Sequence, residues 1–237
     1  SVELQGMGST AITNCEATYQ SDNQEPVTET CSVYMTTFEK NNITFSNTET
    51  LLPGTYNITL SINTANGWEL EDEYTHSLSK QFSIAIADTQ RIPMIEHFSS
   101  STCAPCVLIN MLMHNLTEAN PGKFTYVKYP VSWPGTGDPY FIQEAYDRVL
   151  YYNVSTAPLV FLDSEAQVSN QTAQPVTNSA LMARYNTPAF ADIRGAFNID
   201  GNTINITVDV MSYIDLDNAK TYISINEKTT TGNVGSN

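Results

Sequence analysis

The chain has 237 residues, 41% of them hydrophobic, which is enough to bury the cores of two or three small domains. Its 10 basic and 25 acidic residues give a formal charge of −15, which argues against sequence-independent attraction to nucleic acid or anionic lipid. No run of eighteen apolar residues occurs, so no transmembrane span is expected. The chain shows no initiating Met and no signal-peptide pattern, and we interpret it as a mature or trimmed form, with an export signal or lipid anchor upstream left open.

Residues 1 to about 90 have the pattern of an all-β domain. Apolar and polar side chains alternate over residues 56–62, a turn follows at Asn66-Gly67, and the alternation returns over residues 82–86. Because turn signals recur about every ten residues, we expect an immunoglobulin-like β-sandwich over residues 1–90. The segment LPGTYNITL, residues 52–60, resembles a hairpin strand that is common in bacterial surface modules of this kind.

Two of the four cysteines lie in this first region. Cys15 and Cys31 enclose fifteen residues of a polar segment, and a disulfide closing such a loop contributes on the order of 3 kcal/mol in the chain-entropy model. We predict a structural disulfide between them, which implies an oxidising compartment. Free thiols, or a pairing between domains, are the alternatives.

A short apolar strand then leads into the other two cysteines. After a linker at residues 88–91, the bulky residues of 94–98 predict a buried strand that ends at four hydroxyl residues, 99–102. A helix is expected to start at the cysteines, with Pro105 in its first turn, and to stop at Asn-Pro-Gly, residues 120–122. Its buried stripe is predicted to contain Leu108, Ile109, Leu112 and Leu116.

The position of Cys103 and Cys106 at a helix start predicts thiol chemistry. The free N–H groups and the positive end of the helix dipole favour a thiolate, so Cys103 is the expected attacking thiol and Cys106 the resolving one. A zinc site is the alternative, but with His97 the pair supplies only three ligands. The chain has no phosphate-binding loop and no paired-histidine motif, so the sequence predicts no metal and no cofactor.

At this point the residues resemble the thioredoxin superfamily, in which a strand leads into Cys-x-x-Cys at a helix start and a later cis-proline faces the pair. That proline corresponds to Pro158, which precedes the apolar strand 159–162. The resemblance implies a thioredoxin-like α/β domain over residues 91–188. It also implies an extended substrate beside Pro158, in a groove formed by Thr102, Pro105, Ala157 and Trp133.

Two residues depart from the pattern of that superfamily. Thr102 stands where thioredoxins usually have a tryptophan, and His97 stands where they usually have a buried acid that accepts a proton. His97 has an unperturbed pKa of about 6.5 and suits the same proton transfer. The alternative is a structural histidine of the strand. Trp133 likewise has two interpretations, as a wall of the groove or as a cover of the core.

The remainder of this domain is predicted as a strand, a loop and two helices. The strand covers residues 124–129 and is followed by the loop 130–140. Asp138 is expected to cap a second helix that starts at Pro139, and a third helix is expected over residues 176–185. The second helix should bury Ile142, Ala145, Val149 and Tyr152 on one face.

Residues 189–237 are predicted as a C-terminal β segment. Strict alternation over residues 204–210 predicts one strand, and Tyr222–Ile225 predicts another. So few strands cannot bury a core by themselves. We expect either packing on a neighbouring domain or, as the favoured interpretation, an incomplete second sandwich in a protein that continues beyond Asn237.

This combination of domains resembles the thioredoxin-like outer-membrane lipoproteins of Bacteroidetes, related to the twenty-eight-kilodalton outer-membrane protein. The resemblance implies an exported protein of the periplasm or cell surface, whose partners are protein thiols and disulfides or surface ligands. The expected fold class is multidomain α+β. Two functions stay open: thiol–disulfide exchange through Cys103 and Cys106, or a non-enzymatic surface-binding or assembly protein that uses the fold as a scaffold.

Overall fold

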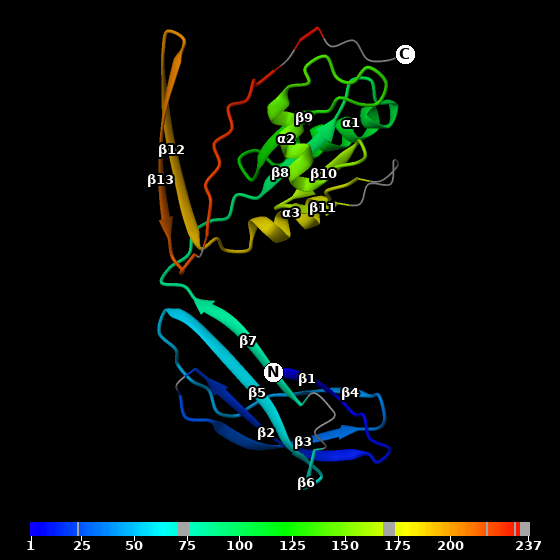
Figure 1. Ribbon diagram of the computed structural model, residues 1–237, viewed down its shortest axis with the longest axis vertical. Coiled ribbons are helices and arrows are strands. Elements are labelled where there is room, and N and C mark those ends of the chain that lie inside the picture. Colours follow the sequence, from blue (N-terminus) through cyan, green and yellow to red (C-terminus); the bar gives the residue numbers. More distant parts are fainter. Residues whose placement is uncertain (23, 71–75, 168–173, 217, 230, 233–237) are drawn as a thin grey trace. The chain divides into compact units, whose positions relative to one another are not determined.

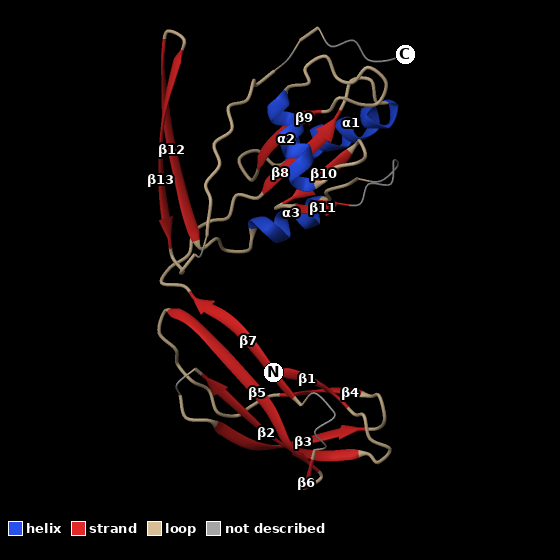
Figure 2. Cartoon of the chain, in the orientation of Figure 1, coloured by secondary structure: helices blue, strands red, loops and turns tan. Residues whose placement is uncertain are grey.

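The computed structural model describes residues 1–22, 24–70, 76–167, 174–216, 218–229 and 231–232 (Figure 1). The chain divides into two compact units. The first, the β unit, consists of Ser1–Asp88 and Phe190–Asn218, and the second, the mixed unit, of Thr89–Ala189 and Ala219–Asn237. Strands make up 41% and helices 16% of the chain, so the β-rich, multidomain part of the predicted fold is confirmed (Figure 2).

In the β unit, residues 1–88 form two antiparallel sheets. One has the order β3-β2-β5-β6, and β7 also pairs with β5, along a part of that strand that β6 does not occupy. The other consists of β1 and β4. The strands are β1 (Val2–Gln5), β2 (Ile12–Ser21), β3 (Val27–Met35), β4 (Lys40–Ile43), β5 (Gly54–Ala65), β6 (Trp68–Glu69) and β7 (Ser77–Ile84).

The larger sheet is apolar on one face and rich in hydroxyl groups on the other, because side chains alternate along each strand. Ala17, Val33 and Met35 are buried on the apolar face, and Ile43 of β4 packs against them. Pairs of hydroxyls bridge neighbouring strands, including Thr18 with Thr28, Thr55 with Ser83 and Thr59 with Ser79.

A long antiparallel ribbon completes the β unit. It consists of β12 (Ala191–Asp200) and β13 (Thr203–Ser212), so the predicted strand over residues 204–210 is confirmed. The predicted strand Tyr222–Ile225 is wrong: these residues are described and are not in a strand. An apolar alternation forms a strand only where a neighbouring strand takes up its N–H and C=O groups, and none does so here among the described residues.

One face of the ribbon is apolar and exposed. The register places Ile193 opposite Val210, Phe197 opposite Ile206 and Ile199 opposite Ile204 on this face, and most of these side chains are accessible, Phe197 at 73%. The other face carries polar residues such as Asn198 and Asn205.

We expect the variant Phe197→Thr to lower the fluorescence of a hydrophobic dye such as anilinonaphthalene sulfonate by about 30–50%, because an aromatic ring supplies much of the exposed apolar area on this face. The β-propensity of threonine keeps the strand itself intact. Asn198→Thr, on the polar face, is the matched control and should leave the fluorescence unchanged. Equal fluorescence from Phe197→Thr and the parent protein would show that the dye does not report on this face.

The mixed unit has a four-stranded sheet with helices on both faces. The sheet order is β11-β10-β8-β9, with β8 and β9 parallel and the other pairs antiparallel. The elements are β8 (Met94–Ser99), α1 (Ala104–Ala119), β9 (Thr125–Pro130), α2 (Gln143–Tyr152), β10 (Leu159–Leu162), β11 (Glu165–Gln167) and α3 (Asn178–Tyr185).

Two apolar clusters hold the helices on the sheet. Ile95 of β8 packs with α1 and with Leu181 of α3, whereas Phe98 packs with Val149 of α2 on the other face. Alternation along β8 therefore decides which helix each side chain meets.

The helix predictions need three corrections. In α1, Met113 is buried where the prediction placed Leu112, which is only partly buried, and Leu108 is half-buried. The helix α2 starts at Gln143, not at Pro139, so Ile142 lies before it and is exposed, while Ala145 and Val149 are buried as predicted. The helix α3 starts two residues later than predicted, at Asn178, because the Thr177 hydroxyl accepts a hydrogen bond from the Ala180 N–H.

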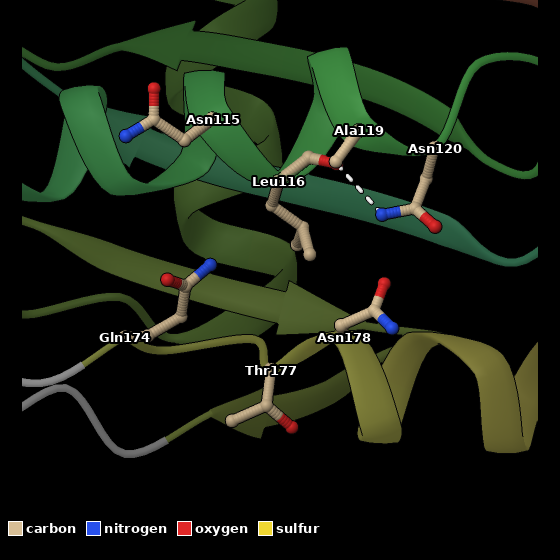
Figure 3. Close-up of a pocket in the computed structure, with 7 residues that line it drawn as sticks. All are labelled: Asn115, Leu116, Ala119, Asn120, Gln174, Thr177 and Asn178. Atoms are coloured by element: carbon tan, nitrogen blue, oxygen red, sulfur yellow. Dashed lines mark hydrogen bonds between the residues drawn. The ribbon is translucent and has the colours of Figure 1, made fainter.

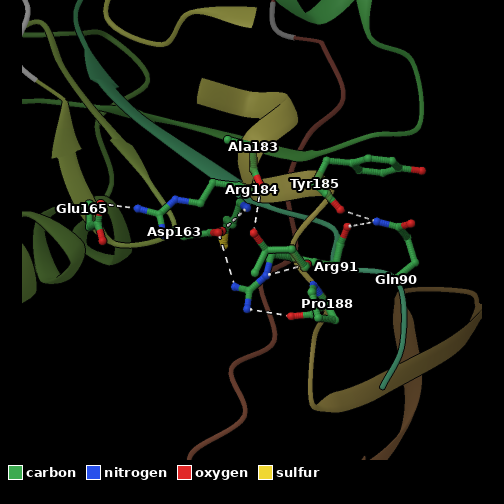
Figure 4. A network of polar contacts seen from close by, with 10 residues as sticks. Gln90, Arg91, Asp163, Glu165, Ala183, Arg184, Tyr185 and Pro188 are labelled. Atoms are coloured by element: carbon green, nitrogen blue, oxygen red, sulfur yellow. Dashed lines mark hydrogen bonds and ion pairs between the residues drawn. The ribbon is translucent and has the colours of Figure 1, made fainter. Parts of the chain in front are cut away.

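The two ends of the contiguous part of the mixed unit are tied together (Figure 4). Thr89 and Ala189 exchange backbone hydrogen bonds of 2.9 and 2.8 Å. The Arg91 guanidinium donates to the carbonyl oxygens of Thr187 and Pro188 and forms an ion pair with Asp163. The chain therefore enters and leaves this part at one place.

Candidate functional site

The strand–helix junction places Cys103 and Cys106 as the sequence predicted. Cys103 is the N-cap of α1 in extended conformation, Pro105 occupies the first turn, and the two cysteines form a disulfide with Cα atoms 5.3 Å apart. The strand β8 is buried on both faces, which holds the start of the helix in a fixed position.

Both cysteines of this pair are covered. Cys103 is 2% exposed and Cys106 0% exposed, although the predicted role of Cys103 requires an accessible sulfur. A helix-opening position gives access only if the neighbouring loops leave it free, and here they do not. Any attack on this disulfide needs a movement of the residues around it.

The peptide that precedes the proline predicted to face the cysteines lies beside Cys103. The Ala157–Pro158 peptide bond is cis, and the Ala157 carbonyl oxygen lies 3.6 Å from the Cys103 sulfur. Pro158 is buried, and β10 follows directly. Residues that are far apart in the sequence thus meet at the start of α1.

A second loop is fastened to the turn before Cys103. The turn consists of residues 100–102, and the loop is the β9–α2 loop, residues 131–142. The Ser101 N–H donates to the Asp138 carboxylate at 2.7 Å, and the Thr102 hydroxyl donates to the Pro134 carbonyl oxygen at 2.7 Å. Sequence reasoning missed this role of Asp138: its carboxylate also accepts from the Tyr140 N–H, so it fixes the loop and does not cap α2.

Trp133 lies in the same loop and packs against the apolar cluster under α2. Its ring contacts the group that includes Phe98, Val131 and Val149, and its indole N–H has no hydrogen-bond partner among the described residues. This placement favours the interpretation of Trp133 as a cover of the core.

His97 is fully buried beside Tyr126. Its Nδ1 lies 2.7 Å from the Tyr126 hydroxyl, and its Nε2 has no partner in the described part of the chain. Burial, and to a smaller extent the charge of Lys128, lower the pKa of His97 to about 3. A base this weak is neutral at pH 7, which favours the structural interpretation over proton transfer.

The neutral state of buried His97 predicts a loss of stability in acid. The unfolded chain binds a proton at His97 below a pKa of about 6.5 and the folded chain only near 3. The contribution of His97 to the free energy of unfolding is therefore complete above pH 6.5. It should be lost as the pH drops from 6.5 to about 3, and the loss should be on the order of 3–5 kcal/mol.

The comparison protein for this test is His97→Asn, whose carboxamide oxygen can replace Nδ1 as the partner of Tyr126. Urea denaturation between pH 4 and 7 should show a smaller pH dependence for this variant than for the parent chain. Identical pH dependence of the two proteins would contradict the assignment to His97.

On the opposite face of β8, Glu96 is the centre of a buried polar network that sequence reasoning missed. Its carboxylate binds the Arg148 guanidinium through two hydrogen bonds, of 2.7 and 3.1 Å, and accepts from the hydroxyls of Tyr129 and Tyr152. The available signal was a single acid within the apolar run of β8. The network joins β8, β9 and α2.

Cys15 and Cys31 lie directly opposite each other on β2 and β3. Both are buried and both are free thiols in this structure. Burial raises the pKa of Cys15 to about 11 and also raises that of Cys31. The structure brings the predicted partners together without the bond, so a disulfide between them stays a prediction.

A surface cavity lies between α1 and the start of α3 (Figure 3). It has a volume of about 330 Å³ and is lined by Asn115, Leu116, Ala119, Asn120, Gln174, Thr177 and Asn178. It contains none of the predicted site residues.

Within the described ranges, no three His, Cys, Asp or Glu side chains gather as metal ligands. No described helix has the length and apolar character that a membrane crossing requires. Comparisons with protein-family models, with curated proteins and with solved structures find no match to this chain.

Proposed function

We propose that this chain is an exported cell-envelope protein whose mixed unit is thioredoxin-like and exchanges disulfides through Cys103 and Cys106. The observation that carries the proposal is the pair of cysteines at the start of α1, with the Ala157 carbonyl oxygen, just before Pro158, 3.6 Å from the Cys103 sulfur. The sheet order and the helices on both faces support the thioredoxin-like assignment, and the two sheets around one apolar core support an immunoglobulin-like assignment of residues 1–88.

The exchange proceeds in two steps. A substrate thiolate attacks the Cys103 sulfur, a mixed disulfide forms, and Cys106 leaves as a thiolate that takes up a proton. A second substrate thiolate then attacks its partner's sulfur in the mixed disulfide and releases Cys103 as a thiolate, which the N–H groups and dipole of α1 stabilise. The substrate ends as a disulfide and the cysteine pair as one thiol, Cys106, and one thiolate, Cys103. With the pair reduced at the start, the same steps run in reverse.

The burial of both cysteines favours a second function. A disulfide that no thiol reaches is a permanent bridge, and the mixed unit is then a scaffold of a surface-binding or assembly protein. The exposed apolar face of the ribbon supports the same view, because large apolar patches mark sites of association. The partners under this alternative are surface ligands.

Trapping with Cys106→Ala distinguishes the two functions. Without the resolving thiol, Cys103 should hold a substrate as a mixed disulfide, which mass spectrometry detects after incubation with insulin. Cleavage at Arg91 and Lys123 isolates a peptide, residues 92–123, that contains this cysteine pair and not Cys15 or Cys31. The double variant Cys103→Ser with Cys106→Ala is the control. If no adduct forms on this peptide, the exchange function is rejected and the scaffold function is retained.

A further inference from the structure

The β9–α2 loop is attached to three of the residues before Cys103, namely Ser99, Ser101 and Thr102. The Val131 N–H donates to the Ser99 carbonyl oxygen at 3.0 Å and continues the ladder of β8 and β9. The Ser101 N–H donates to Asp138 and the Thr102 hydroxyl to the Pro134 carbonyl oxygen, each at 2.7 Å. The loop therefore holds the turn before Cys103, in addition to the hydrogen bond that the Cys103 N–H donates to the Ser100 carbonyl oxygen.

The two side chains that make these attachments have additional partners that fix them. The Asp138 carboxylate also accepts from the Tyr140 N–H at 2.9 Å, and the Thr102 hydroxyl lies 2.8 Å from that of Ser100, which is itself buried. Charged acceptors make stronger hydrogen bonds than neutral ones. Both side chains are thus held in single positions between the loop and the turn.

Cys103 is enclosed between this turn and the Ala157–Pro158 peptide. On one side the Ala157 carbonyl oxygen lies 3.6 Å from its sulfur, and on the other the attached turn precedes it directly. Since Cys103 is 2% exposed, an incoming thiolate reaches the sulfur only when residues around it move, and the turn is among these neighbours. The turn is the side whose attachment depends on side chains.

We propose that Thr102 and Asp138 are specificity-determining residues of the Cys103–Cys106 site: their hydrogen bonds to Pro134 and Ser101 keep the turn closed and exclude large thiols from Cys103. This inference rests on the proposed exchange function. Thr102 stands where thioredoxins usually have a tryptophan, so here a hydrogen-bonded loop does the work of covering the cysteines.

The test measures how fast two thiols of different size reduce the disulfide. Dithiothreitol reduces the pair through a mixed disulfide and becomes a cyclic disulfide, and reduced glutathione reduces it with two molecules and becomes glutathione disulfide. Thr102→Val keeps the shape of the side chain and removes the donor. Asp138→Ala removes the acceptor, and Asp138→Asn keeps an acceptor oxygen.

We expect Thr102→Val and Asp138→Ala to raise the rate of reduction by glutathione at least about tenfold, the change that corresponds to one hydrogen bond of ordinary strength. The rate with dithiothreitol should rise less, so the dithiothreitol rate divided by the glutathione rate should fall. Asp138→Asn should lie closer to the parent protein. The reduction potential should stay the same, because closure slows attack and release alike.

Matched controls lie elsewhere in the same unit. Thr117→Val removes a similar bond, from the Thr117 hydroxyl to the His114 carbonyl oxygen, and Asp147→Asn changes an exposed acid of α2. Glutathione rates within twofold of the parent for both Thr102→Val and Asp138→Ala would overturn the proposal, as would an equal rise in the controls. If the Thr102→Val variant does not fold, the glutathione rate of Asp138→Ala alone tests the proposal.

The rates separate this inference from the proposed function. A faster reduction in the variants, together with no adduct in the insulin trap, would confirm the closed turn and reject exchange with proteins. An adduct in the trap together with unchanged rates would retain the function and reject the roles of Thr102 and Asp138.

Discussion

The variant Arg148→Ala is expected to lower the free energy of unfolding of the mixed unit by about 3–5 kcal/mol, the cost of leaving a buried charge without its partner. The Glu96 side chain is 2% exposed and has Arg148 as its ion-pair partner. The hydroxyls of Tyr129 and Tyr152 remain as donors but do not balance the charge. Urea denaturation followed by the fluorescence of Trp133, with Trp68 replaced by Phe, isolates this unit.

Two further variants show whether the ion pair itself is responsible. Arg184→Ala removes a more exposed pair with Glu165 in the same unit and should cost less than about 1 kcal/mol. Replacing both Glu96 and Arg148 by Met should recover most of the lost stability, since a well-packed apolar pair often equals a buried ion pair. A loss below 1 kcal/mol for Arg148→Ala would mean that Glu96 is not held as an isolated buried charge.

The variant Gly137→Ala is expected to destabilise the mixed unit by about 2–4 kcal/mol and to open the β9–α2 loop. A Cβ atom at this position would lie 2.6 Å from the backbone carbon and oxygen of Ser132, and the φ angle is +76°. Because Gly137 is next to Asp138, a displaced backbone also moves the carboxylate that accepts from Ser101. The same denaturation assay measures the stability, and alkylation of Cys103 after reduction measures the access.

Gly135→Ala is the matched control in the same loop. Its φ angle is +60°, but a Cβ atom there meets nothing within 4 Å, so only the backbone strain remains, about 1 kcal/mol. Equal losses of stability in the two glycine variants would show that contact with Ser132 does not matter.

The sequence predicted those features that depend on local pattern. The apolar run of 94–98, the cysteines with Pro105 and the Ala157-Pro158 peptide each carry their signal in a few neighbouring residues, and the structure brings them together. The alternation over 204–210 is also local, and it formed a strand because β12 pairs with it.

The features that sequence reasoning missed depend on distant partners. Asp138 followed by a proline has the pattern of a helix cap, but it binds Ser101, 37 residues earlier in the chain. Glu96 has no local sign of its partner, because Arg148 lies 52 residues away. The apolar residues of Tyr222–Ile225 also predicted a strand, yet no described strand pairs with them. The cover over Cys103 is a property of loops, which follow no periodicity.

The two candidate functions differ in whether the Cys103–Cys106 disulfide can be reduced by other thiols. The position at the start of α1 favours a reactive pair, while the attached turn and the burial of both cysteines favour a permanent bridge. A disulfide that exchanges must be reducible by cellular thiols, whereas structural disulfides resist them.

The reduction potential of the Cys103–Cys106 pair is the measurement that decides this most directly. It is obtained by equilibrating the protein with dithiothreitol mixtures and counting alkylated thiols on the peptide of residues 92–123. Exchange predicts a potential between about −270 and −120 mV, the range of working dithiol oxidoreductases. A value below about −300 mV would contradict the exchange function and identify the pair as a permanent bridge.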